Sequence, residues 1–128
     1  MIKLKKKEVL TINESLTYLS QQKTSAWYPI SKNLKLVKPF ILDINETKEE
    51  LIKNLAKIDE EGKVSTKNQN GITVIDWKDE KEATTLWDDI LNEEVSIDFY
   101  KFGIDKLNDL KLEAVVIEPL LDVCLIEE

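Results

Sequence analysis

The sequence predicts a mainly helical α+β domain, with four or five helices around one long kinked helix and a small β-hairpin. Three observations lead to this fold class. The 128 residues are 42% apolar, which suits one compact domain, and we assign residues 1–128 to a single domain. Only three glycines and three prolines occur, which favours helices over a loop-rich sandwich. Apolar residues recur at helical spacing as far as Ile58, and an Asn-Gly pair follows.

The first segment, residues 1–7, is predicted to be extended, because Ile2 and Leu4 alternate with lysines. From Glu8 onward the apolar spacing becomes helical, and this helix should end at residues 20–22. Its predicted buried face consists of Val9, Ile12, Leu16 and Leu19.

The strongest helical pattern starts at "SAWYP" and ends at Ile58, with a stripe of 4-3-4-3 spacing: Ile30, Leu34, Val37, Ile41 and Ile44. We expect one helix of about 30 residues with a kink near residues 35–38, because the ring of Pro39 clashes with the preceding turn. Thr47 and Glu50 have capping-box spacing and favour a rival interpretation, in which a second helix starts there. The stripe could be buried against the first and last helices or against another copy of the chain.

The segment "KIDEEGKVSTKNQNGITVIDW" is predicted to contain a β-hairpin. Gly62 is the expected helix stop, and "KVST" (residues 63–66) is short and β-branched, as a first strand requires. Asn70-Gly71 is the commonest tight-turn dipeptide, and "ITVI" is a good second strand. The segment lacks the alternating acids of an EF-hand and the Lys-Ser/Thr ending of a phosphate-binding loop.

The rest of the chain, from residue 79 onward, combines helical and strand-like spacing of apolar residues. A helix is predicted from Asp79 or Glu80, with this apolar face: Ala83, Leu86, Trp87, Ile90 and Leu91. The alternation in "VSIDFYKF" suggests a strand or an extended packing segment over residues 95–102. A helical turn should then carry Ile104, Leu107 and Leu110, and a final helix should hold Pro119 in its first turn.

The composition excludes much catalytic chemistry. All basic residues are lysine, so the chain lacks both the commonest general base, histidine, and the bidentate arginine fork. Cys124 stands in the apolar run "LLDVCLI" and should be a buried small hydrophobe. Asp89 and Glu93 could share a hard cation on one helix face, but we expect a solvated acidic surface. We therefore expect no enzyme, no metal and no cofactor.

The charge is unevenly distributed. Residues 1–38 hold eight lysines and two acids, a net charge of +6, whereas residues 39–128 hold ten lysines and 23 acids, a net charge of −13. Such asymmetry can mark an interaction surface, or the basic start can pack beside the acidic segments. The candidate partner-binding residues are two aromatics before Pro29 and two acidic pairs: Trp27, Tyr28, Asp88, Asp89, Glu93 and Glu94.

The lysine run, the lengths of the apolar stretches and the cysteine count indicate which other partners and which location to expect. The lysine run Lys3–Lys7 contains no aromatics and no arginine, so nucleic acid is not an expected partner. No stretch approaches the roughly 18 apolar residues of a membrane span, and no signal-peptide core follows the first lysines. One cysteine allows no internal disulfide. We expect a soluble protein of a reducing compartment.

Several segments together resemble a known family: "MIKLKKKEVL", "SLTYLS", "ELIKNLAKIDEEGK", "TTLWDDILNEEVSID" and "LNDLKLEAVVIEPLLDVCLI". In this order they resemble a family of small proteins of unknown function encoded by tailed phages and prophages. Two departures are Pro39 inside the long helix and the lack of arginines in the middle of the chain.

The resemblance implies a phage origin. Together with the lack of a catalytic residue pattern, it leads us to expect a non-enzymatic phage accessory protein, either a minor virion component or an assembly factor that acts through protein–protein contacts. Its place would be the host cytoplasm or the virion, and its partners phage structural proteins, a host protein or another copy of itself. The alternative is an acidic host-directed inhibitor that binds a host nucleic-acid enzyme or defence protein.

Overall fold

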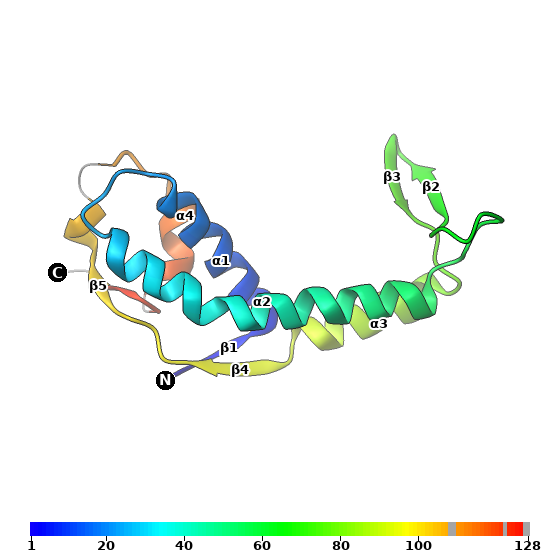
Figure 1. The fold of residues 1–128 in the computed structure, drawn as a ribbon, viewed down its shortest axis with the longest axis horizontal. Coiled ribbons are helices and arrows are strands. Elements are labelled where there is room, and N and C mark those ends of the chain that lie inside the picture. Colours follow the sequence, from blue (N-terminus) through cyan, green and yellow to red (C-terminus); the bar gives the residue numbers. More distant parts are fainter. Residues whose placement is uncertain (108–109, 122, 127–128) are drawn as a thin grey trace. The chain divides into compact units, whose positions relative to one another are not determined.

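A computed structural model describes residues 1–107, 110–121 and 123–126 of the chain (Figure 1). Its contacts divide into two compact units. Unit 1 comprises residues 1–42 and 93–128, and unit 2 comprises residues 43–92. The long helix α2, Trp27–Leu55, supplies residues to both. The architecture is α+β and mainly helical, as predicted.

Unit 1 begins with strand β1, Ile2–Lys5, and helix α1, Lys6–Ser20. The N-terminus of α1 is capped because the Glu8 carboxylate accepts a hydrogen bond of 3.0 Å from the backbone N–H of Lys5. The helix starts two residues before the expected Glu8, and it buries the predicted face. Its buried apolar residues are Val9, Ile12, Leu16 and Leu19.

β1 pairs antiparallel with strand β4, Glu94–Ile97. Leu4 lies opposite Val95, and Lys5 lies opposite Glu94. The sequence predicted two extended segments but not this pairing, because no short-range turn connects strands whose paired residues are 89 to 95 positions apart in the chain. The strand expected over residues 95–102 is shorter, since residues 98–101 lie outside any strand.

The C-terminal part of unit 1 consists of short elements: β5 (Phe102–Gly103), the 3₁₀ helix η1 (Ile104–Leu107), α4 (Ala114–Ile117), the 3₁₀ helix η2 (Glu118–Leu120) and β6 (Leu125–Ile126). β5 and β6 pair in parallel. The expected final helix is thus a single turn of α4 followed by η2, and Pro119 lies at the start of η2.

These elements enclose one hydrophobic core, whose buried members come from α1, the first part of α2, the strands β1 and β4, and the chain that follows β4. Ile30 and Val37 of α2 are nearly or fully inaccessible, as are Leu120 and Leu125 near the C-terminus. The predicted stripe of α2 therefore packs inside its own chain here, against the first and last elements.

Unit 2 contains the second part of α2, a hairpin of β2 (Thr66–Gln69) and β3 (Ile72–Ile75), and helix α3, Glu80–Leu91. The rival helix start at Thr47 is wrong, because α2 continues through it and the Thr47 hydroxyl donates to the Asp43 carbonyl at 2.9 Å. Pro39 also lies within α2, and the kink there stays a prediction.

The hairpin forms around the predicted Asn-Gly turn with the predicted second strand, but its first strand is Thr66–Gln69 and not the expected segment 63–66, because the tight turn pairs the residues directly before Asn70 with β3. Asn70 and Gly71 both have positive φ, 55° and 81°, which a tight Asn-Gly turn requires. The backbone N–H of Lys78 donates to the Leu55 carbonyl at 2.9 Å, so the segment after the hairpin returns to the end of α2. Asp79 then caps α3 by accepting a 3.1 Å hydrogen bond from the N–H of Glu82.

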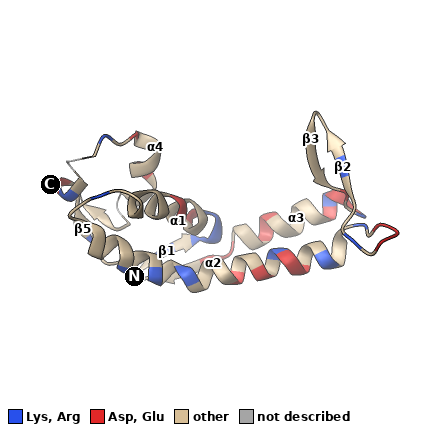
Figure 2. Cartoon of the chain, turned by 45° about the horizontal axis from the view of Figure 1, so that its top comes forward, with Lys and Arg blue, Asp and Glu red and all other residues tan. Residues whose placement is uncertain are grey.

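Both lysines and acidic residues occur along the helices of unit 2 (Figure 2). Residues 43–92 contain 13 acids and seven lysines, a net charge of −6. In the described part of the chain, no helix is both long and apolar enough to cross a membrane.

Candidate functional site

The main candidate site is a surface hollow of about 470 Å³ in unit 1, beside the start of α2. The first part of α2 forms one wall, and the segment that follows β4 forms the other. Its lining residues are Tyr28, Lys32, Lys35, Leu36, Asp98, Phe99 and Tyr100. Volumes of this size suit the side chains of a partner segment or a small molecule.

Three exposed aromatic rings run along the edge of this hollow. The centroids of Trp27 and Tyr28 are 5.7 Å apart, and those of Tyr28 and Tyr100 are 5.9 Å apart, each pair in edge-to-face geometry. Trp27 is 67% exposed, Tyr28 46% and Tyr100 50%. Trp27 and Tyr28 were predicted as partner-binding candidates, and the structure exposes both.

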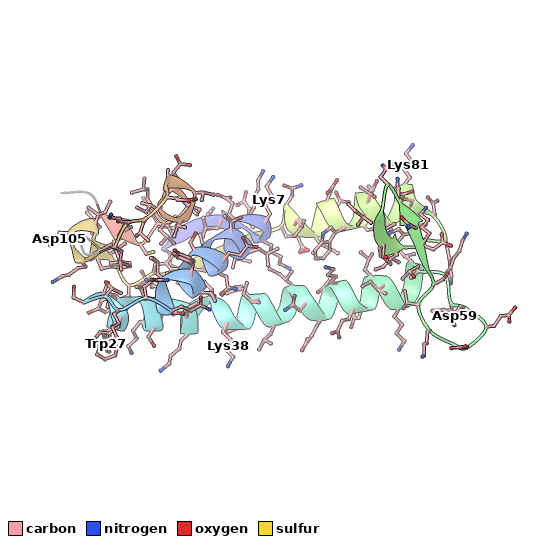
Figure 3. The ribbon with its side chains drawn as sticks, turned by 90° about the horizontal axis from the view of Figure 1, so that it is seen from above. Lys7, Trp27, Lys38, Asp59, Lys81 and Asp105 are labelled. Carbon is pink, nitrogen blue, oxygen red and sulfur yellow. The ribbon has the colours of Figure 1, made fainter. Side chains whose placement is uncertain are left out.

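Lysines flank the rings. The Nζ atom of Lys32 lies 5.6 Å from the centre of the Tyr28 ring, within cation–π range. Trp27 and Lys38 project from the side of α2 that faces away from α1 (Figure 3). In the described residues, neither Lys32 nor Lys35 forms an ion pair with a carboxylate.

Asn33 fixes the backbone at Tyr100. Its side chain is fully buried; the amide nitrogen donates to the Tyr100 carbonyl at 2.8 Å, and the amide oxygen accepts from the Tyr100 N–H at 2.7 Å. Both backbone polar groups of Tyr100 are thus satisfied by one side chain. This pair of hydrogen bonds holds the second wall of the hollow against α2.

The start of α2 is anchored as well. The Thr24 hydroxyl donates to the Lys106 carbonyl at 2.8 Å and accepts from the N–H of Ala26 at 3.2 Å. Ala26 itself is fully buried. The aromatic pair Trp27 and Tyr28 therefore follows directly on a fixed segment.

The acidic candidates do not join this site. Glu93 and Glu94 lie in unit 1, where the Glu93 carboxylate is 3.6 Å from the Lys6 ammonium and Glu94 is opposite Lys5 in the sheet. The basic start of the chain thus packs beside acidic residues. Asp88 and Asp89 belong to unit 2 and are exposed on α3.

A smaller hollow of about 180 Å³ lies within unit 2, lined by Lys48, Leu51, Trp77, Ala83, Thr84 and Trp87. Lys48 Nζ is 5.9 Å from a ring centre of Trp87. The expected apolar face of α3 is only partly buried: Ala83 is buried and Trp87 is half-buried, whereas Leu86 is 40% exposed.

The groups that could support catalysis are few. Burial raises the pKa of the Cys124 thiol to about 12, so this cysteine stays a neutral thiol inside the core, as its apolar surroundings in the sequence suggested. Across the described residues, no group of three or more acidic or cysteine side chains is placed to hold a metal ion.

Sequence reasoning missed Asn33, Tyr100 and the lysines of the hollow, although two signals were present. Asn33 falls between Ile30 and Val37 on the apolar stripe, where a polar residue indicates a buried hydrogen-bonding role. Tyr100 alternates against Phe99 and therefore points away from the core.

The chain matches no protein-family model, no curated protein and no solved structure.

Proposed function

We propose that this protein is a non-enzymatic phage accessory protein, a minor virion component or an assembly factor, and that it binds a protein partner through the hollow beside α2. The observation that carries the binding role is the row of exposed rings, Trp27, Tyr28 and Tyr100, held on a fixed backbone. Exposed aromatic side chains supply much of the energy of protein interfaces, and a rigid arrangement lowers the entropy lost on binding. The phage origin rests on the resemblance of the sequence segments.

The test is an affinity pull-down of the tagged full-length chain from the native host, during infection if a phage carries the gene, with mass spectrometry of the retained proteins. We expect capsid, portal or tail proteins among them. A matched pull-down uses the Trp27→Ala, Tyr28→Ala, Tyr100→Ala triple variant, which should lose these proteins. Equal recovery by both forms would contradict the role of the hollow.

The alternative function, a host-directed inhibitor, is favoured by one observation: the net charge of −6 on unit 2, with Asp88 and Asp89 exposed on α3. An acidic protein of this kind would occupy a basic site on a host nucleic-acid enzyme or defence protein. It predicts that the pull-down retains a single host protein, that salt releases it, and that Asp88→Asn with Asp89→Asn weakens its capture. Recovery of untagged copies of the chain alone would instead indicate a homo-oligomer.

A further inference from the structure

We infer that the hollow beside α2 accepts an acidic segment of the partner protein, with one aromatic or large aliphatic side chain inserted beside Tyr28 and Tyr100. This inference rests on the proposed binding function and names the chemistry of the partner. Two features of the hollow support it. One is an apolar floor, formed by Leu36 and Phe99. The other is a positive rim, formed by Lys32 and Lys35, which have no carboxylate partner among the described residues.

The apolar floor is the reason to expect an inserted aromatic or aliphatic side chain, which serves as the anchor of the partner segment. Leu36 is 38% exposed and Phe99 is 6% exposed, and both line the hollow together with the two tyrosine rings. An inserted side chain would cover the exposed parts of Leu36, Tyr28 and Tyr100 at once. Removing such adjoining apolar surface from water favours association, and aromatic edges add a geometric preference.

The positive rim is the reason to expect acidic residues in the partner segment. Residues 27–42 of α2 contain three lysines, Lys32, Lys35 and Lys38, and no acid. The first turn of this helix also lacks an acidic side chain, so the positive end of its dipole has no compensating charge of its own there. Asp98 is the only acid among the described residues that line the hollow, and its carboxylate lies 4.0 Å from the N-terminal ammonium of Met1.

The complementary partner therefore carries carboxylates on either side of an apolar anchor. Carboxylates would approach Lys32 and Lys35, which have no carboxylate partner among the described residues. A basic segment would instead meet Lys32 and Lys35, two like charges against the single acid Asp98 in the lining, and it should be rejected.

A random peptide library displayed on a carrier tests this chemistry without knowledge of the natural partner. The library is selected on the wild-type protein and counter-selected on the Tyr28→Ala, Tyr100→Ala variant. Both tyrosines are about half exposed, and the hydrogen bonds at position 100 involve only its backbone, so the variant should fold. We expect enriched peptides with Asp or Glu flanking Trp, Phe, Tyr or Leu.

The best enriched peptide is then synthesised and titrated onto charge variants. Lys32→Glu with Lys35→Glu should weaken binding at least about tenfold, and added salt should weaken binding to the wild type. The control, Lys23→Glu with Lys111→Glu, changes the net charge equally at two exposed lysines outside the hollow, and it should change affinity less than about threefold.

Two results would overturn the inference: enrichment of neutral or basic peptides, or no enrichment over the tyrosine variant. If the native pull-down still depends on Trp27, Tyr28 and Tyr100 in that case, the hollow binds a partner of different chemistry and the proposed function stands. If the pull-down also fails to depend on these residues, the proposed function fails with the inference.

Discussion

Unit 1 and unit 2 differ most in how much apolar surface they bury. Of the described residues, 15 hydrophobic side chains of unit 1 form one buried cluster, including Leu16, Ile30 and Leu120. In unit 2, only Ile44, Ala56 and Ala83 are buried hydrophobic residues. Its strand β2 is exposed at every position. Burial of apolar surface is the main stabilising term in folding, so unit 1 holds most of the stability of the chain.

This difference shows why the two units suit different kinds of interaction. A dense core can fix an exposed side chain in one position. In unit 1, the buried residue Ala26 directly precedes Trp27 and Tyr28, and the buried side chain of Asn33 holds the backbone of Tyr100. The exposed charges of unit 2 are solvated and can be screened by salt, so they suit long-range attraction more than tight, oriented contact. We therefore expect affinity to come mainly from unit 1.

The largest expected effect is on the core of unit 1. Leu16 is fully buried in α1, and Leu16→Ala should lower the free energy of unfolding by about 2–5 kcal/mol, because it removes apolar contacts and leaves a cavity. Leu42→Ala is the control: Leu42 is 52% exposed, and its loss should cost less than about 0.5 kcal/mol. Urea unfolding, followed by far-ultraviolet circular dichroism, measures both.

The same unfolding experiment tests the prediction of a single domain. Alkylation of Cys124, which is buried in the native state, reports the opening of unit 1. In a Trp27→Phe background, the fluorescence of Trp77 and Trp87 reports unit 2. Because α2 supplies residues to both units, we expect the two probes to follow one transition. Two separate transitions would show that the units unfold independently.

A smaller but more specific effect is expected at Asn33. Asn33→Ala removes both hydrogen bonds to the Tyr100 backbone, and it should cost about 1–3 kcal/mol because the Tyr100 N–H and carbonyl lose their partners. It should also weaken partner capture, although Asn33 is buried and cannot touch a partner. Ser31→Ala, at an exposed neighbouring position, is the control for both readouts. Unchanged capture by a folded Asn33→Ala protein would mean that the position of Tyr100 does not matter.

The smallest effect concerns unit 2. Asp79→Ala removes the N-terminal cap of α3 and should destabilise the protein by about 1 kcal/mol, measured as the shift of the Trp77 and Trp87 transition in urea. Lys81→Ala, on the same turn but without the cap role, should shift it much less. Capture of the partner should not change. A loss of capture with Asp79→Ala would place binding energy in unit 2.

The sequence predicted the elements whose signals are local. Regular apolar spacing predicted α1, α2 and α3, and the Asn70-Gly71 pair predicted the hairpin between β2 and β3. The pairing of β1 with β4 and the parallel pairing of β5 with β6 depend on distant segments, and no short-range signal specifies them. In place of the expected final helix, the structure has one turn of α4 and the short 3₁₀ helix η2 around Pro119. Tertiary packing outweighs helical propensity there.

The candidate site was predicted only in part for the same reason. Trp27 and Tyr28 could be singled out because they adjoin a helix start in the sequence. Tyr100 joins them through a contact between residues 72 positions apart, and Asn33 creates that contact from a stripe of otherwise apolar residues. Glu93 and Glu94 instead lie beside Lys6 of α1 and Lys5 of β1. A count of net charge cannot distinguish acids that are paired in this way from acids on an open surface.

The most direct test of the central claim is the affinity of the first partner recovered from the host extract, measured by isothermal titration calorimetry with three proteins: the wild type, Tyr28→Ala with Tyr100→Ala, and Asp88→Asn with Asp89→Asn. We predict that the tyrosine variant binds at least about thirtyfold more weakly, because it removes two exposed rings of the hollow. The aspartate variant should stay within about threefold of the wild type, since Asp88 and Asp89 lie on α3 and do not line the hollow. The reverse order would contradict the account and locate the binding surface on the acidic helix α3.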